Sequence, residues 1–405
     1  MKRAVIVLGL VIAGVAVWGL VTYGPNLRWY LRVRWRAIAA SRREPAALEA
    51  WRNEFGDPAA TLAASPAHGD NATAARLRAL GPGAGVNFNG PAEPPPSTRA
   101  IADYVSVEEM KTGGPSGAPP EAVRSYLDAH KPGLDTVVDL LTQAETPSWR
   151  TSDLGFRHPD IPLLAIRELN GVLAAEALTD SSRGRDAEAE RALLASWQLT
   201  ASTRDCPSVL GQSLAEQSLT VQAIIARRLA IDAASWRVRL REPDALASMM
   251  RTIVIHDSQM WSTVDSQTAR AARADYLDLE RAFWVKLRNL PVTAQLAGSF
   301  SEADARRDGW SVGAVAAAIA QAEDERAWRS AESVALQIEL SDRVLEARQL
   351  KAQLGRWPAA IPNIETSRIA GVHWNYGVGS DGLMSVGVSP TLQGMGPPLR
   401  FESRE

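Results

Sequence analysis

The sequence predicts a mostly α-helical protein with an N-terminal transmembrane helix, a helical body and a small C-terminal β-hairpin. Three observations predict this fold class. An apolar run without a charged residue spans 4–23, apolar residues recur at helical spacing over 121–354, and they alternate with small or polar residues over 372–388. The chain has 405 residues, of which 46% are hydrophobic and 22% charged, so it can form more than one domain with a core.

The apolar run follows the basic pair Lys2 and Arg3. Twenty helical residues span about 30 Å, which is the thickness of the hydrocarbon core of a bilayer. A cleaved signal peptide is the alternative, but residues 21–25 lack a small-x-small cleavage pattern. We therefore expect an uncleaved anchor within 1–27, which contacts the lipid bilayer through 4–23.

The charges on either side of this anchor disagree about its orientation. Six arginines within 28–43 outnumber Lys2 and Arg3, and the positive-inside rule then places the body in the cytoplasm. A short basic leader before the first apolar run is typical of an exported protein. Residues 28–80 are predicted to form this basic juxtamembrane stretch and short helices, and the stretch has the pattern of a segment that lies along anionic headgroups or simply continues the helix.

Residues 81–120 are predicted to be a linker, because 15 of these 40 residues are Gly or Pro. Only 98–110 has the composition of a short helix. The Gly-rich sequence 81–85 is similar to a phosphate loop but lacks the Lys-Ser/Thr ending, so it does not predict a nucleotide site.

Residues 121–354 are predicted to form helices of about 15 to 40 residues joined by short turns. This pattern indicates an α-helical bundle or an irregular α-solenoid. Pro132 and Gly133 are predicted to interrupt the first helix, since proline removes a hydrogen bond and clashes with the preceding turn. The last helix is expected to run from about Ser311 to Leu354.

The tail, 355–405, begins where Gly355 and Pro358 end that helix. A β-hairpin with a turn at 380–382 is expected, and its apolar face is predicted to pack on the last helix because an isolated hairpin is marginal in water. Residues 391–405 are predicted to be frayed. The expected contact is between two sets of residues: Val372, Trp374, Tyr376, Met384, Val386 and Val388 on the hairpin, and Ile338, Leu345 and Leu350 on the helix.

The sequence Leu-Gly-Arg-Trp-Pro at 354–358, followed by Tyr376, Ser-Asp-Gly at 380–382 and Ser-Val-Gly at 385–387, resembles the C-terminal region of type II secretion major pseudopilins. The resemblance covers about the last 60 residues and implies a helix exit into a small sheet. The N-terminus departs from that family, since it lacks the Gly-Phe processing site and the early Glu of the mature helix. The resemblance therefore does not imply assembly into a pilus.

A broader resemblance is to an uncharacterised family of bacterial membrane-anchored proteins that place this tail after an Ala/Leu-rich helical body. Residues 70–74, the 173–199 helical hairpin and the exit at Gly355 occur in that family's order. The resemblance implies a single-pass protein of the bacterial inner membrane with its body in the periplasm.

No stretch carries a specific catalytic, cofactor or metal motif, so no catalytic, cofactor-binding or metal-binding residue and no cofactor is predicted. The net charge of −2 does not favour nucleic acid as a partner. The single cysteine, Cys206, excludes an intramolecular disulfide. It is better explained as a small buried residue than as a catalytic thiol.

The group of residues that most resembles a catalytic or metal-binding site is His256, Asp257 and Asp265, with Asp275, Asp278 and Glu280 further along the chain. His256 and Asp265 are nine residues apart and fall on opposite sides of a continuous helix, so a solvated polar face explains them better than a metal or acid-base site. The 13 tryptophans include Trp197, Trp284 and Trp328 on apolar helix faces. They predict core packing, with an aromatic ligand groove as the alternative.

Two functions remain open. The first is a membrane-anchored, non-enzymatic scaffold or interaction protein of the bacterial cell envelope, with an envelope protein as partner. The second is a membrane-tethered hydrolase that uses dispersed carboxylates such as Asp257, Asp265 and Asp278. Two convergent carboxylates in a buried pocket would favour the hydrolase, and a broad apolar groove without them would favour the first function.

Overall fold

The computed structural model describes most of the chain after the predicted anchor. The residues described are 35, 38–39, 41–64, 71–89, 96–114, 116–149, 162–204, 208–259, 266–292, 312–392 and 396–404. The predicted anchor at 4–23 and Cys206 lie outside them. Among the helices that the structure does describe, none has the length and hydropathy needed to span a bilayer.

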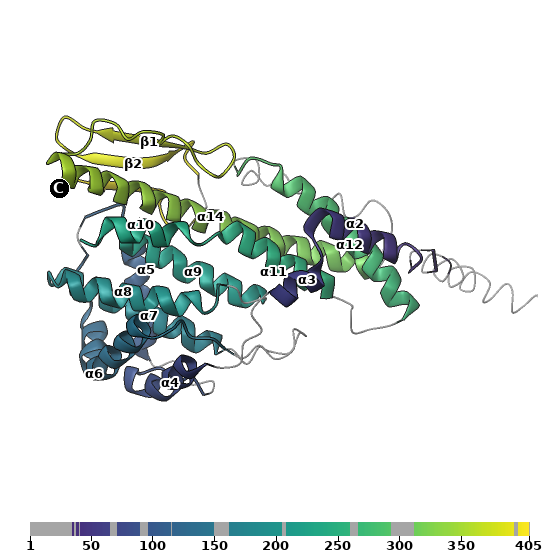
Figure 1. The fold of residues 1–405 in the computed structure, drawn as a ribbon, viewed down its shortest axis with the longest axis horizontal. Coiled ribbons are helices and arrows are strands. Elements are labelled where there is room, and N and C mark those ends of the chain that lie inside the picture. The colour runs from purple at the N-terminus through teal and green to yellow at the C-terminus, as the bar shows by residue number, and fades with distance from the viewer. Residues whose placement is uncertain are drawn as a thin grey trace, which may run out of the picture. The chain divides into compact units, whose positions relative to one another are not determined.

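The fold is mostly α-helical with one small C-terminal sheet (Figure 1), which confirms the predicted class of the described part. The elements are α2 (Glu44–Phe55), α3 (Pro58–Ala64), α4 (Ala72–Leu80), the 3-10 helix η1 (Gly81–Ala84), α5 (Pro96–Glu109), α6 (Glu121–Gln143), α7 (Leu163–Ser182), α8 (Asp186–Ala201), α9 (Val209–Ala226), α10 (Ala233–Arg241), α11 (Ala245–Gln259), α12 (Gln267–Arg288), α14 (Val312–Leu354), β1 (His373–Val378), β2 (Met384–Ser389) and β3 (Arg400–Ser403).

The chain divides into two compact units. The smaller unit holds the described residues of Met1–Gly56, Ser258–Val285 and Glu302–Gln321, and the larger holds those of Asp57–Asp257, Lys286–Ser301 and Ala322–Glu405. In the smaller unit Arg43 at the start of α2 donates to Asp275 of α12 at 2.6 Å. Position 313 of α14 requires glycine, because a Cβ there would lie 2.1 Å from the backbone oxygen of Ala272.

The centre of the larger unit is α7, which packs against α5, α8 and α9 (Figure 1). A helix that is apolar on all sides is typical of a buried position, and most of α7 is buried, including Leu169 and Leu173. The α7–α8 turn contains Gly184 at φ +72°, a conformation that glycine adopts without strain. These two helices form the antiparallel hairpin expected from the sequence at 173–199.

One prediction for the larger unit is wrong. Helix α6 continues through Pro132, and the helix is held there by packing of Leu134, Val137 and Leu141 into the core. Position 133 requires glycine, since a Cβ there would lie 2.1 Å from the oxygen of Gly83 in η1. Within 81–120 the structure has η1 and the 14-residue helix α5, and α5 lies where a short helix was expected at 98–110.

The C-terminal sheet has the order β1-β2-β3 and is antiparallel throughout. In the β1–β2 register Trp374 faces Val388 and Tyr376 faces Val386. The predicted hairpin is confirmed, but the sheet has a third strand where the sequence predicted fraying, because Phe401 of β3 is buried beside Val386.

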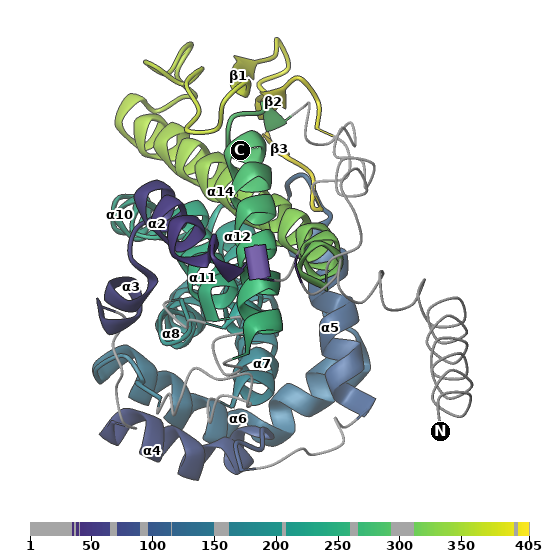
Figure 2. The same ribbon diagram turned by 90° about the vertical axis from the view of Figure 1, so that its right-hand side faces the viewer.

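The sheet packs on α14, as both views show (Figures 1 and 2). The helix contributes Leu336, Leu340, Val344 and Ala347 to this core, and the tail contributes Val372, Trp374, Met384, Val386 and Phe401. The prediction that the hairpin docks on the last helix is therefore confirmed. The predicted contact residues on the helix are wrong except for Leu350, which packs at the edge.

Candidate functional site: a cavity in the helical body

A cavity of about 1240 Å³ lies within the larger unit. Its walls come from α5, α7, α9 and α14, and the segment at Gly396 and Pro397 closes part of its edge. Small-molecule pockets usually measure roughly 300–1,000 Å³. The cavity therefore has room for a ligand larger than most metabolites.

Helix α5 is held in place at its C-terminal end by a buried ion pair. Arg228, just after α9, donates to the Glu108 carboxylate at 2.7 Å and to the Glu108 backbone oxygen at 2.7 Å. Both side chains are nearly inaccessible, with exposures of 1% and 4%. Removing one partner of such a pair leaves a buried uncompensated charge, so this contact fixes the position of the α5 wall.

The apolar walls come mainly from α5 and α7. Ile101, Ala102 and Val105 of α5 line the cavity together with Leu164 and Val172 of α7. Of these residues, Leu164 is 69% exposed and Ala102 is exposed, whereas Ile101, Val105 and Val172 are buried. The accessible apolar part of these two walls is therefore formed by Ala102 and Leu164.

Neutral polar side chains form the buried end of the cavity. Ser196 donates to the Asn170 side-chain oxygen at 2.9 Å, and Asn170 donates to Ser218 at 3.2 Å. Gln222 donates to Ser196 at 2.7 Å. Since these groups largely satisfy one another, the buried end presents neutral hydrogen-bonding groups and no charge.

The charged residues of the lining are on its more exposed part. Arg99, Arg167 and Arg326 come from α5, α7 and α14, and all three are exposed. Among the residues that the structure describes, none of these three arginines forms an ion pair. A fourth, Arg329, is paired with Glu325.

Two carboxylates also line the cavity. Glu168 accepts a hydrogen bond from Thr98 at 2.9 Å, which joins α7 to α5. Glu109 is only partly exposed, and burial raises its pKa to about 7. The lining therefore has four cations against two acids, and one of the acids titrates near neutral pH.

Hydrogen bonds from the protein interior hold the edge of the cavity that Gly396 and Pro397 form. Gln337 of α14 donates to the Pro397 backbone oxygen at 2.8 Å, and Arg227 donates to the Gln337 side-chain oxygen at 2.7 Å. Arg227 is 1% exposed, and burial lowers its pKa to about 9. The tail thus reaches the cavity through hydrogen bonds from the core of the body.

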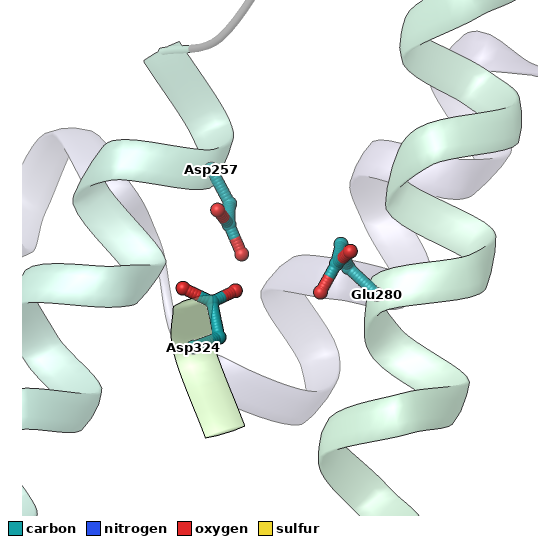
Figure 3. A group of neighbouring side chains, drawn as sticks. All are labelled: Asp257, Glu280 and Asp324. Atoms are coloured by element: carbon teal, nitrogen blue, oxygen red, sulfur yellow. The ribbon is translucent and has the colours of Figure 1, made fainter. Parts of the chain in front are cut away.

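A second group of functional interest is the pair Asp257 of α11 and Asp324 of α14, both in the larger unit (Figure 3). Their carboxylate oxygens lie within 4.8 Å of each other, and their exposures are 0% and 4%. Burial, together with the negative charge of Asp257, raises the pKa of Asp324 to about 9. Asp324 is therefore protonated at neutral pH beside Asp257. Glu280 of α12, also drawn in Figure 3, belongs to the smaller unit.

These two carboxyl groups could also be considered as metal ligands. Hard cations bind carboxylate oxygens, but Ca²⁺ takes six to eight ligands. Asp257 and Asp324 alone do not provide such a set. What the pair shows is a neutral Asp324, kept protonated by burial and by the charge of Asp257.

The structure describes most of the polar residues considered from the sequence. His256 lies 3.3 Å from the Asp257 carboxylate, Asp265 is outside the described residues, and Asp278 forms an ion pair with Arg43 at 3.4 Å in the smaller unit. The interpretation of Asp257 as part of a solvated face is wrong, because its side chain is fully buried.

The prediction that the tryptophans on apolar helix faces pack in the core is confirmed. Trp197, Trp284 and Trp328 are 3%, 0% and 8% exposed and pack in the core. Within the part of the chain that the structure describes, no tryptophan lines the cavity. An aromatic ligand groove is therefore not what the cavity provides.

Sequence reasoning missed Asp324 and the cavity itself. Asp324 stands in a run of charged residues at 323–326 that reads as a solvated helix face. No family model, no curated protein and no solved structure matches the chain.

Proposed function

We propose that the protein is a membrane-anchored, non-enzymatic binding protein of the bacterial cell envelope, whose helical body takes up a small molecule in the cavity between α5, α7, α9 and α14. The observation that carries this proposal is the cavity, whose 1240 Å³ volume is far larger than the voids that a close-packed protein interior leaves. The buried end is neutral and hydrogen-bonded, which suits binding better than catalysis.

The binding proposal is tested by filling the cavity. Ala102 is an exposed residue of α5 whose side chain lines the cavity, so Ala102→Trp adds bulk there without replacing a core residue. Ala122, exposed on α6 and outside the lining, gives the matched control Ala122→Trp. The full-length chain is purified in lipid nanodiscs, denatured, and its retained small molecules are identified by mass spectrometry.

We expect one small molecule to be retained by the wild type and by Ala122→Trp and to be lost from Ala102→Trp. Equal retention by the two tryptophan variants, or retention by none of the three proteins, contradicts the proposal. Circular dichroism of each variant establishes that the helical fold is kept.

The anchor and its orientation are part of the same proposal and rest on the apolar run at 4–23 and the resemblances of the sequence. Mass measurement of the mature protein should find residues 4–23 still attached. An alkaline phosphatase fused after Glu405 should be active if the body is in the periplasm. If the phosphatase fusion is inactive and a fluorescent protein fused at the same position is fluorescent, the body is in the cytoplasm, as the count of arginines predicts.

The pseudopilin resemblance enters the proposal through the tail. Trp357 and Tyr376, the aromatic residues that carry that resemblance, are partly buried against the core that the sheet shares with α14, and the segment that follows β2 forms an edge of the cavity. We propose that the tail is a fixed part of the binding body. The stability of a Trp374 variant, developed in the Discussion, is its test.

A membrane-tethered hydrolase is the second candidate, and the convergence of Asp257 and Asp324 favours it. A protonated acid beside an ionised one is an arrangement that acid-base enzymes use. Against it, both side chains are buried and neither lines the cavity. Turnover of an ester, glycoside or peptide substrate that Asp257→Asn and Asp324→Asn both abolish, in folded protein, would establish this function instead.

A further inference from the structure

The charge on the cavity's lining indicates what kind of molecule it binds. Three arginines from three different helices, Arg99, Arg167 and Arg326, line the cavity. The structure describes no acid paired with any of them, although the chain as a whole has a net charge of −2. A cavity lined mainly by charges of one sign raises the local concentration of the opposite charge, which here is an anion.

The position of these arginines limits where the anion sits. They are exposed, whereas Asn170 and Ser196 at the other end are 6% and 1% exposed. An anionic group would therefore bind at the exposed arginines, and the accessible apolar side chains beside them on α5 and α7 are Ala102 and Leu164. The buried end accepts a neutral group, because its hydrogen-bonding side chains carry no charge.

The acids of the lining do not cancel this preference. Glu168 is engaged by Thr98. Glu109 loses its charge as the pH falls below about 7, so the net positive charge of the lining increases on the acidic side of neutrality. The other charged groups of the lining are arginines, which keep their charge over this range.

Resting on the function proposed above, we infer that the ligand is an amphiphile with an anionic head group, a phosphate or carboxylate held by Arg99, Arg167 and Arg326, and with an aliphatic chain along the walls of α5 and α7. Guanidinium groups form paired hydrogen bonds with phosphate and carboxylate oxygens. The apolar wall gives the affinity that a free anion would lack.

The test is equilibrium binding of radiolabelled dodecyl phosphate, below its micelle concentration, to the full-length protein in nanodiscs, with empty nanodiscs subtracted. Arg167→Glu reverses one charge at the opening. Arg76→Glu is the matched control, because Arg76 is equally exposed on α4 and outside the lining. We expect Arg167→Glu to weaken binding roughly tenfold or more and Arg76→Glu to have little effect.

Further arms separate the sources of affinity. Dodecyltrimethylammonium should not compete, and inorganic phosphate should compete only weakly because it lacks the aliphatic chain. Binding of dodecanoate, whose carboxylate stays ionised over this range, should tighten between pH 8 and pH 6 in the wild type. In Glu109→Gln it should be tighter at pH 8 and change less over this range.

Each opposite result overturns the inference. Equal weakening in Arg167→Glu and Arg76→Glu, equal competition by the cationic amphiphile, or inorganic phosphate bound as tightly as dodecyl phosphate would each do so. If a neutral molecule is retained by the wild type and lost from Ala102→Trp while dodecyl phosphate does not bind, the cavity still binds a ligand and only the anionic class is wrong.

Discussion

Replacing Trp374 by Ala tests whether the C-terminal sheet is a structural part of the helical body. Trp374 is fully buried between β1 and α14, in one core with Leu340 and Val386. Its indole nitrogen donates to the Glu339 carboxylate at 2.8 Å. The side chain therefore contributes both apolar packing and one hydrogen bond to the contact.

The expected cost follows from these contacts. An aromatic side chain that buries roughly 150–250 Å² contributes about 4–6 kcal/mol at 25 cal/mol per Å². Measured aromatic-to-alanine changes in cores cost about 3–5 kcal/mol, because neighbours relax into part of the cavity. Glu339 keeps hydrogen bonds from Ser367 and Arg368, so it is not left without a donor. We expect a loss of about 4 kcal/mol.

The measurement is urea unfolding of the full-length chain, followed by circular dichroism and by hydrogen exchange of the β2 amides. Trp374→Phe keeps most of the apolar volume and should lose less than the alanine variant. Leu354→Ala, at a leucine that is 58% exposed, should change the free energy of unfolding by no more than about 0.5 kcal/mol. If Trp374→Ala unfolds at the wild-type midpoint and its β2 amides exchange no faster, the sheet does not contribute to the body and the proposal for the tail fails.

Three further predictions concern single positions in the larger unit. Gly171→Ala should stabilise the protein by about 0.5–1 kcal/mol in thermal unfolding, because Gly171 is mid-helix in α7 and a Cβ there meets only one atom, at 3.9 Å. Gly133→Ala should instead lower the melting temperature, because the backbone of Gly83 is in the way. Asp324→Asn should remove a pH dependence: the folded pKa of Asp324 is raised to about 9, so the folded state holds the proton more tightly and wild-type stability falls as the pH rises from about 4 to 9. Equal slopes of unfolding free energy against pH in wild type and Asp324→Asn would show that Asp324 is not protonated in the folded state.

The fold class was predictable because local patterns determine it. The helix ending at Leu354, the hairpin around its turn at 380–382 and the α7–α8 hairpin were found at the expected places, since periodicity and Gly or Pro signals act over a few residues. The third strand was missed because β3 is only four residues long and is stabilised by the pairing of Phe401 with Val386, which are distant in sequence. Local propensity does not contain that contact.

The error at Pro132 has a physical cause. Tertiary packing overrides a local propensity when it buries enough apolar surface. Helix α6 buries apolar residues on both sides of Pro132. The cavity could not be predicted for the same reason, because its lining joins residues from 98 to 397 that meet only in the folded chain.

The buried acids and the free arginines have a common implication for where function resides. Natural sequences are usually consistent with their fold at every level, and departures from that consistency concentrate at functional or strained sites. Burial keeps Asp324 protonated in the folded state, whereas the unfolded chain ionises it at neutral pH, and this difference lowers the stability of the fold. A side chain that does not ionise would avoid this cost. Arg167 and Arg326 both line the cavity, and neither has an ion-pair partner among the described residues. Only the arginines, however, lie where a ligand can reach them, with the exposed apolar side chains Ala102 and Leu164 in the same lining. The arginine-lined opening, and not the buried acid pair, is therefore the part of the body whose energetic cost binding of a ligand would offset.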